Sequence, residues 1–216
     1  MSVNLEVINL FSSTKHHQQK MTAQSESTSH CQTRAATPKD LTAIAEILAD
    51  SFHSRAGING WIYPLLRLGI YEDIRNRLNS SSPHYVCLVA VVSATHHPNS
   101  WEYLAGTVEM ALRSNYPWPF NNSCFYPYLS NLAVQQDCRR QGAAQQLLLK
   151  CERIALAWGF QDIYLHVLEN NHQARSLYFK LGYRLHRIDG TWTSLLLGQP
   201  RRLLLHKQIK LPAQSN

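Results

Sequence analysis

Residues 129–183 read LSNLAVQQDCRRQGAAQQLLLKCERIALAWGFQDIYLHVLENNHQARSLYFKLGY and carry the clearest structural pattern in the chain. The mostly apolar run at 129–134 is typical of a strand that is covered on both faces. Polar residues follow, among them the turn former Asp137. From 144 to 158 apolar residues recur at spacings of three and four, and Gly159 stands where a helix C-terminal cap belongs. This order predicts strand, turn and helix, with the helix beginning within residues 139–144.

The start of this helix is suited to binding a phosphate. The first amides of a helix lack internal acceptors and together carry about half a positive charge, so they attract anions. Gly142 and its small neighbours let an anion approach the backbone closely, and Arg139 and Arg140 add positive charge. An ordinary helix start with one flexible glycine would contain the same residue types. Residues further along the chain are needed to distinguish a phosphate-binding turn from an ordinary helix start.

A second strand and helix follow the first pair. Residues 163–168 are apolar apart from His166, and the next helix has an apolar face that includes Tyr178 and ends near Gly182. Asn171 and Tyr178 are seven residues, or about two turns, apart and project from the same side of this helix. Asn171 suits a helix N-cap, and a tyrosine on an apolar face is commonly a packed core residue.

This arrangement resembles the Gcn5-related N-acetyltransferase (GNAT) family and is similar to its cyanobacterial and plastid-type members. Residues 139–144, RRQGAA, match the family pattern Arg/Gln-x-x-Gly-x-Gly/Ala, and FKLGY at 179–183 matches its usual helix ending. The resemblance covers most of 32–208 and is strongest over 129–183. Two departures are Gln135-Gln136, where proline is common, and Cys138, where an aromatic residue or histidine is usual. We expect little effect on cofactor affinity, and we interpret Cys138 as a small buried thiol rather than an oxidation-sensitive one.

The resemblance implies an α/β (α+β) fold, with a mixed, mostly antiparallel sheet of about seven strands flanked by about four helices. It implies an acetyl-CoA-dependent N-acetyltransferase with acetyl-CoA as co-substrate and no metal. Asn171 would contact the pantetheine arm, Tyr178 would protonate the leaving thiolate, and one amide of 132–134 would face the thioester oxygen. The cofactor-binding residues it implies are Leu132, Ala133, Val134, Arg139, Arg140, Gln141, Gly142, Ala143, Ala144, Gln145, Asn171 and Tyr178.

The general base has two candidates. Some family members that modify protein N-termini carry a glutamate where this chain has His166, and an imidazole with a pKa near 6.5 is mostly neutral around pH 7. A hydrogen-bonded structural histidine is the alternative. Glu109, in the strand-like segment 105–112, is the second candidate and would act through water; a merely solvated glutamate is its alternative.

The preferred activity is acetylation of a protein amine, because relatives of the plastid kind acetylate lysine side chains and N-termini. The amine would attack directly in a ternary complex, where proximity carries much of the barrier. Three alternatives remain open. These are a small amine acceptor such as a polyamine or amino acid, a non-catalytic acyl-CoA sensor, and transfer of a longer acyl group.

Residues 1–30 are predicted to be a disordered leader, 31–210 the acetyltransferase domain, and 211–216 a tail. The leader contains no arginine and no long apolar run, which argues against a typical transit peptide or secretory signal; Met21 is a possible alternative start.

Strands are predicted near 32–36, at 84–93 and 101–112, and within 191–210. Thr37 is expected to cap a helix, and 61–78 to be a helical region interrupted near Pro64 and Gly69, either a substrate wall or a helix packed on the sheet. Residues 113–126 are expected to be a long loop.

Composition narrows the setting of the protein. Five cysteines without a pairing pattern indicate a reducing compartment, so we expect a cytoplasmic protein, or one of the plastid stroma if the protein is of plant origin. The formal charge of +7 comes from scattered basic residues, which predicts no nucleic-acid partner. No run is long enough to span a membrane, and the histidine pairs lack metal-site spacing. The expected partners are protein substrates that present a lysine or N-terminal amine; the oligomeric state is left open.

Overall fold

The structure is a computed structural model that describes residues 30–52, 62–80, 82–93, 102–115, 124–189 and 200–210. These residues form one sheet with the order β1-β2-β3-β4-β5-β7-β6, in which only the β4–β5 pair is parallel. The strands are β1 (His30–Ala35), β2 (Tyr85–Ser93), β3 (Glu102–Asn115), β4 (Cys124–Val134), β5 (Asp162–Leu168), β6 (Arg184–Asp189) and β7 (Arg202–Gln208). The α-helices are α2 (Leu41–Phe52), α3 (Ile62–Asn79), α4 (Ala143–Ala157) and α5 (His172–Lys180). The predicted fold class is therefore confirmed.

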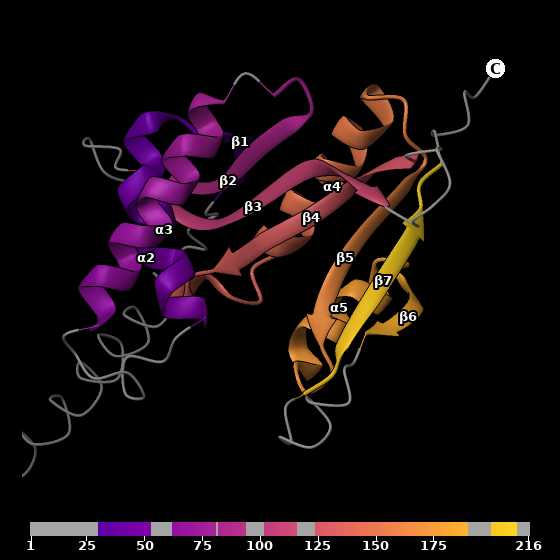
Figure 1. Cartoon of the computed structure of the whole chain (residues 1–216). Helices are drawn as coiled ribbons and strands as arrows, with labels where there is room; N and C mark the ends of the chain where they lie inside the picture. The colour runs from indigo at the N-terminus through magenta and orange to yellow at the C-terminus, as the bar shows by residue number, and fades with distance from the viewer. Residues whose placement is uncertain are drawn as a thin grey trace, which may run out of the picture.

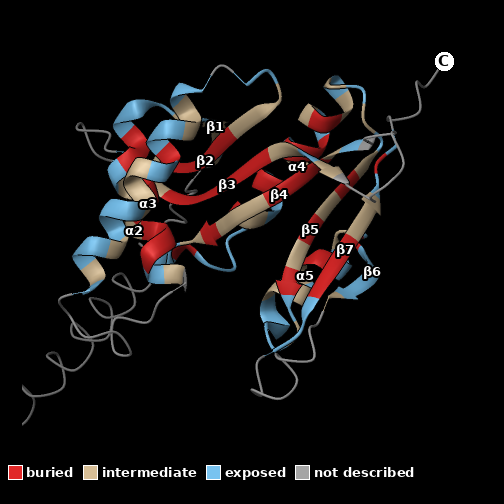
Figure 2. Cartoon of the chain, in the orientation of Figure 1, coloured by how far each residue is buried: buried red, intermediate tan, exposed pale blue. Residues whose placement is uncertain are grey.

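Helices cover the two faces of this sheet unequally. α2 and α3 lie over the β2–β3 side of one face, whereas α4 and α5 lie behind the sheet (Figure 1). The larger apolar core joins α4 and α5 to the back of β2–β5 and β7, and the smaller one joins α2 and α3 to the front of β2. Buried residues concentrate in β2 and β3, while β6 is almost wholly exposed (Figure 2). Among the described elements, none covers the front of β5 and β7.

The N-terminal part of the domain is fixed by a capped turn. β1 begins at His30, two residues before the predicted strand. Thr37 and Asp40 form a capping box around a short 3-10 helix (Pro38–Asp40), and Asp40 also binds Arg34 at 2.7 Å. The guanidinium of Arg34 is the main cause that lowers the pKa of Asp40 to about 2, so this carboxylate stays charged. The predicted leader up to residue 29 and the predicted tail 211–216 lie outside the described residues.

The predicted interruption of the helix at 61–78 is wrong, because α3 runs without a break from Ile62 to Asn79. Pro64 lies in the first turn, where a missing amide hydrogen removes no intrahelical bond. Gly69 is exposed, and a Cβ there would meet no atom within 4 Å, so the glycine weakens the helix without bending it.

The predicted loop at 113–126 is shorter than expected. β3 continues to Asn115 and β4 begins at Cys124, with Arg113 paired to Tyr126 in the antiparallel register. The Arg113 guanidinium lies 3.6 Å from the centre of the Tyr128 ring, a cation–π contact that helps hold these strand ends together. Residues 116–123 lie outside the described residues, as does the predicted turn at 94–100.

Candidate active site

A β-bulge shapes the strand that leads to the predicted phosphate turn. Ser130 pairs with Glu109 and Ala133 with Thr107, so β4 has one residue more than β3 between these pairs. Asn131 takes a left-handed conformation with φ of 53°, which asparagine tolerates better than most residues. The bulge turns the end of β4 away from its original direction.

Beyond the bulge, β4 and β5 separate. Their parallel pairing is confined to Tyr128–Tyr164 and Leu129–Leu165, and the two ribbons diverge from there (Figure 1). Leu132, Ala133 and Val134, the predicted cofactor-binding strand, lie in the part of β4 that β5 does not pair with. Gly106 on β3 permits a close approach here, because a Cβ at this glycine would lie 2.7 Å from the Ala133 carbonyl oxygen.

Glu109 holds the bulge in place. Its carboxylate is 2 % exposed and accepts hydrogen bonds from Asn131 Nδ2 at 2.6 Å and from the Tyr85 hydroxyl at 2.7 Å. Arg77 of α3 supplies the opposite charge: its Nη2 donates at 3.2 Å, and its Nε lies 2.9 Å from Oε2 without the alignment of a hydrogen bond. The alternative of a solvated glutamate is wrong, because Glu109 is buried and its hydrogen bonds tie β3 to the bulge.

We expect Glu109→Gln to lower the free energy of unfolding by roughly 1–3 kcal/mol, measured by urea denaturation. The estimate is below that for a fully buried ion pair because the Arg77 side chain is 37 % exposed and also contacts Asp73. Glu72→Gln is the matched control. Glu72 pairs with Arg75 on the exposed surface of α3, the helix that also carries Arg77. If both variants lose a similar amount of unfolding free energy, Glu109 does not anchor the bulge.

The turn between β4 and α4 has the form of an anion cradle. Arg140 and Gly142 both have positive φ values, 66° and 87°, and such turns point successive amides in one direction. The first helical bond of α4 runs from the Gln146 amide to the Gly142 carbonyl, so the amides of residues 143–145 have no acceptor within the helix. A Cβ at Gly142 would meet no atom within 4 Å, which shows open space above the turn.

The neighbours of the turn agree with the predictions. Gln141 braces it by donating to the Asp137 carbonyl at 3.0 Å, and the Arg139 and Arg140 side chains are exposed. Cys138 is buried, at 3 % exposure, as expected. The helix starts at Ala143 and is followed by Gly159 in the left-handed region, so the predicted bounds of this helix are confirmed.

The second helix places Asn171 and Tyr178 as the sequence predicted. The Asn171 side-chain oxygen accepts from the Ala174 amide at 3.1 Å, so the N-cap role is confirmed, while its side-chain amide group is left for other contacts. Tyr178 is 7 % exposed and packs edge-on against Tyr183 at 5.8 Å between ring centres. Burial raises the pKa of Tyr178 to about 12, and the nearby Tyr128 adds to the effect. The phenol is therefore protonated throughout the physiological pH range.

On the opposite face, His166 is the centre of a hydrogen-bonded chain. Its Nε2 lies 2.8 Å from the Asp189 carboxylate, and its Nδ1 lies 2.8 Å from the Tyr128 hydroxyl. A carboxylate accepts only, so Nε2 carries the hydrogen and Nδ1 of the neutral ring accepts from Tyr128. The alternating positions of β5 explain this placement, because Ile163, Leu165 and Val167 face the core and His166 faces away from it.

The surroundings of this hydrogen-bonded chain favour a neutral His166 beside a charged Asp189. Burial lowers the pKa of His166, the Asp189 carboxylate partly opposes this, and Arg202 and Arg113 lower the pKa further. Hydrogen bonds from Arg187 and His166 lower the pKa of Asp189 to about 2. Sequence reasoning found His166 but missed Tyr128 and Asp189, whose approach depends on the pairing of β4, β5, β7 and β6.

The comparisons with known proteins agree with this geometry. The model of the acetyltransferase (GNAT) family matches residues 42–183. GCN5-related N-acetyltransferase 10, a chloroplastic protein of Arabidopsis thaliana, is 28 % identical over 173 residues, which span 78 % of this chain and 68 % of the relative. The chloroplastic GCN5-related N-acetyltransferase 7 of the same plant is 40 % identical over 78 residues, 36 % of this chain and 28 % of that protein.

Solved structures show the same fold. The Arabidopsis thaliana NAA60 structure in complex with acetyl-CoA matches with a TM-score of 0.61 and 20 % identity, over 83 % of this chain and 99 % of that one. The PaiA N-acetyltransferase of Thermoplasma acidophilum in complex with coenzyme A matches with a TM-score of 0.57, 20 % identity and the same coverage. At such identities the structures support the fold alone.

The chain belongs to the acetyltransferase (GNAT) family, as the family match across residues 42–183 establishes. It is therefore an N-acetyltransferase of this family. Within the described ranges no three His, Cys, Asp or Glu residues gather as a metal site would require. None of the described helices is long and apolar enough to cross a membrane.

Proposed function

We propose that the chain acetylates a protein amine, an N-terminal α-amine or a lysine side chain, by direct attack on acetyl-CoA. The observation that carries this proposal is the Tyr128–His166–Asp189 chain on the face of the sheet opposite α4 and α5, beside the point where β4 and β5 separate. A donor thioester held by the β4–α4 turn and by the end of β4 that lies apart from β5 would have Tyr178 on one side and Tyr128 on the other.

During the attack, protons move along the Tyr128–His166–Asp189 chain. The Tyr128 oxygen takes a proton from the attacking ammonium or from a bridging water, while Tyr128 passes its own proton to Nδ1 of His166. The resulting imidazolium is stabilised by the Asp189 carboxylate. The amine nitrogen forms a bond to the thioester carbon, and an amide of residues 132–134 supports the oxyanion. The carbon–sulfur bond then breaks, and Tyr178 gives its proton to the departing sulfur. The nitrogen loses its second proton to restore the Tyr178 hydroxyl, and His166 releases the first proton to solvent.

Charge on this face favours a protein acceptor over a polyamine. A polyamine would need carboxylates that have no other partner, but both acids on the face are engaged. Asp189 binds His166 and Arg187, and Asp162 lies 2.6 Å from His206 Nε2. An open sheet face also suits an extended chain better than a small cation. The chloroplastic relatives make the plastid stroma the location that we propose.

The test is mass spectrometry of peptides incubated with the protein and acetyl-CoA, comparing wild type with Tyr178→Phe. We expect acetylated N-termini or lysines, formed about tenfold more slowly by the variant, because a thiol of pKa near 8.5 leaves without full protonation. The affinity for acetyl-CoA should be unchanged. Tyr71→Phe, a half-buried tyrosine on α3, is the control and should match wild type.

Two results would contradict the proposal in different ways. If the protein binds the coenzyme but forms no peptide product, the acceptor is not a protein. A small-amine acceptor or an acyl-CoA sensor would then be favoured. Peptide acetylation at an unchanged rate in Tyr178→Phe would leave the acceptor assignment intact and remove Tyr178 from the chemistry.

A further inference from the structure

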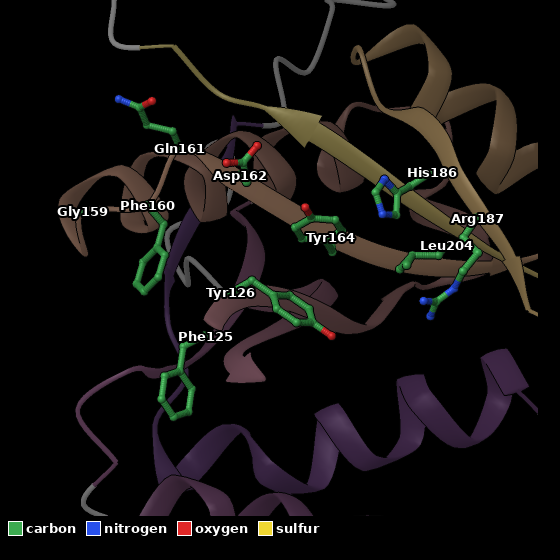
Figure 3. A pocket seen from close by; sticks show the side chains of 10 residues that line it. All are labelled: Phe125, Tyr126, Gly159, Phe160, Gln161, Asp162, Tyr164, His186, Arg187 and Leu204. Atoms are coloured by element: carbon green, nitrogen blue, oxygen red, sulfur yellow. The ribbon is translucent and has the colours of Figure 1, made fainter. Parts of the chain in front are cut away.

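A cavity of about 470 Å³ opens on the uncovered face, at the start of β4 and β5 and away from the phosphate turn. Its size falls within the range of about 300–1,000 Å³ that is usual for ligand sites. Figure 3 shows the Tyr126 ring in the middle of the cavity wall, with Tyr164 beside it and Phe125 and Phe160 at one end. His186, Arg187 and Leu204 close the other end.

The lining is dominated by rings. Tyr126 and Tyr164 meet edge to face with 4.9 Å between ring centres, and His186 lies 5.6 Å from Tyr164. Phe125 is 56 % exposed, although its side chain gains nothing from contact with water. Tyr164 is half-buried, so this part of the wall is already partly shielded from solvent. Such a wall favours another flat or apolar group.

The charged groups at the rim argue against a charged occupant. Asp162 lies 2.6 Å from His206, and Arg187 donates to Asp189 at 2.6 Å. A cationic or anionic guest would compete with one of these pairs for its partner, and it would lose hydration on entry. An uncharged aromatic side chain needs neither change.

The cavity is continuous with the proposed acceptor position. Tyr164 and His166 are two residues apart on β5 and point to the same face, a separation of about 7 Å, and Asp162 is about 7 Å further. Tyr128 of the proton chain pairs directly with Tyr164. An extended peptide advances about 3.3–3.5 Å per residue, so the cavity lies two or three residues beyond an amine placed at Tyr128.

We propose that this cavity is a specificity subsite that receives an aromatic side chain two or three residues beyond the acetylated residue of a peptide acceptor. The inference rests on the proposed protein acetylation and names the substrate class that this site prefers. Tyr126, Phe160 and Tyr164 form its ring wall, and the paired charges at its rim exclude Lys, Arg, Asp and Glu from the same position.

The experiment compares N-terminal peptides of equal length in which positions 3 and 4 carry Phe, Ala, Lys or Glu. We expect kcat/KM for the Phe peptides to exceed that for the Ala peptides by about tenfold, and the Lys and Glu peptides to be no better than Ala. In Tyr126→Ala this preference should shrink to less than about twofold, while the Ala peptides keep their rate and acetyl-CoA its affinity. Phe179→Ala is the control, because Phe179 is exposed on α5, away from the cavity.

The outcomes separate the cavity from the reaction. Equal rates for Phe and Ala peptides, or a Phe preference that persists in Tyr126→Ala, would contradict the proposed subsite. Either result would leave the proposed protein acetylation unaffected. Acetylation of a small arylalkyl amine with no peptide product would overturn both, because the cavity would then hold the body of a small acceptor. Unchanged binding of acetyl-CoA by Tyr126→Ala shows that the variant is folded in every case.

Discussion

Replacing Gly142 with glutamate is expected to raise the dissociation constant for acetyl-CoA by about a hundredfold or more, which corresponds to ~2.7 kcal/mol. The φ of 87° at this residue is one that only glycine adopts without cost, so any side chain strains the turn by about 1–2 kcal/mol. The new Cβ would enter open space above the turn, where no protein atom lies within 4 Å. A carboxylate in that space occupies the position proposed for the pyrophosphate and repels it.

Gly159→Glu is the matched control for this prediction. Gly159 follows the same helix and has the same φ of 87°, and a Cβ added there would likewise meet no atom within 4 Å. Its variant therefore carries the same backbone strain and the same added charge far from the cradle. Calorimetric titration with acetyl-CoA should show wild-type affinity for Gly159→Glu. If both variants lose the same affinity for acetyl-CoA, backbone strain alone weakens binding. The assignment of the turn as an anion cradle would then be contradicted.

The features that the sequence predicts well are those set by neighbouring residues. The turn at 139–144, the cap at Asn171 and the helix ends at Gly159 and Gly182 all depend on contacts within a few positions, and each is present. The same local reasoning failed where tertiary contacts override propensity. Burial of Ile74 and the packing of Tyr71 hold α3 together across Gly69.

The parts of the site that escaped prediction are those assembled from distant segments. Asn131 looks like an ordinary polar residue in LSNLAV, and its left-handed bulge becomes clear only when Glu109 is seen 22 positions away on β3. Asp189 lies 23 residues after His166 on an edge strand, and β7 separates the two strands in the sheet. No spacing rule links such residues, because sheet order alone brings them together.

Removing the imidazole by His166→Ala is expected to lower kcat by about 10²–10⁴-fold, the usual contribution of a positioned general base. Tyr128 would keep its hydroxyl but lose the acceptor for its proton. His84→Ala serves as the control, because His84 packs against Trp158 outside the chain of hydrogen bonds. A variant that keeps more than about a third of the wild-type kcat would show that the amine reacts without this base.

Asp189→Asn tests the same chain through its pH dependence. Asp189 raises the pKa of His166 both as a hydrogen-bond partner and as a charge, so its neutralisation should lower that pKa further below the ordinary value. For an N-terminal amine of pKa about 7.7–8.0 that arrives as the ammonium, log kcat/KM should rise with a slope of one below the His166 pKa and level off above it. The break between the slopes should therefore move to lower pH in Asp189→Asn, while the plateau falls because the imidazolium loses its counter-charge.

The neighbouring pair of Asp162 and His206 supplies the control for that shift. Asp162→Asn removes a histidine–carboxylate contact of 2.6 Å on the same face, but it leaves His166 and its partners untouched. We expect its break point to coincide with that of wild type. A break that stays in place in Asp189→Asn, or one that moves equally in both variants, would mean that His166 does not titrate in the reaction. The proton of the amine would then leave by way of solvent, and the Tyr128–His166–Asp189 chain would be a structural tie between β4, β5 and β6.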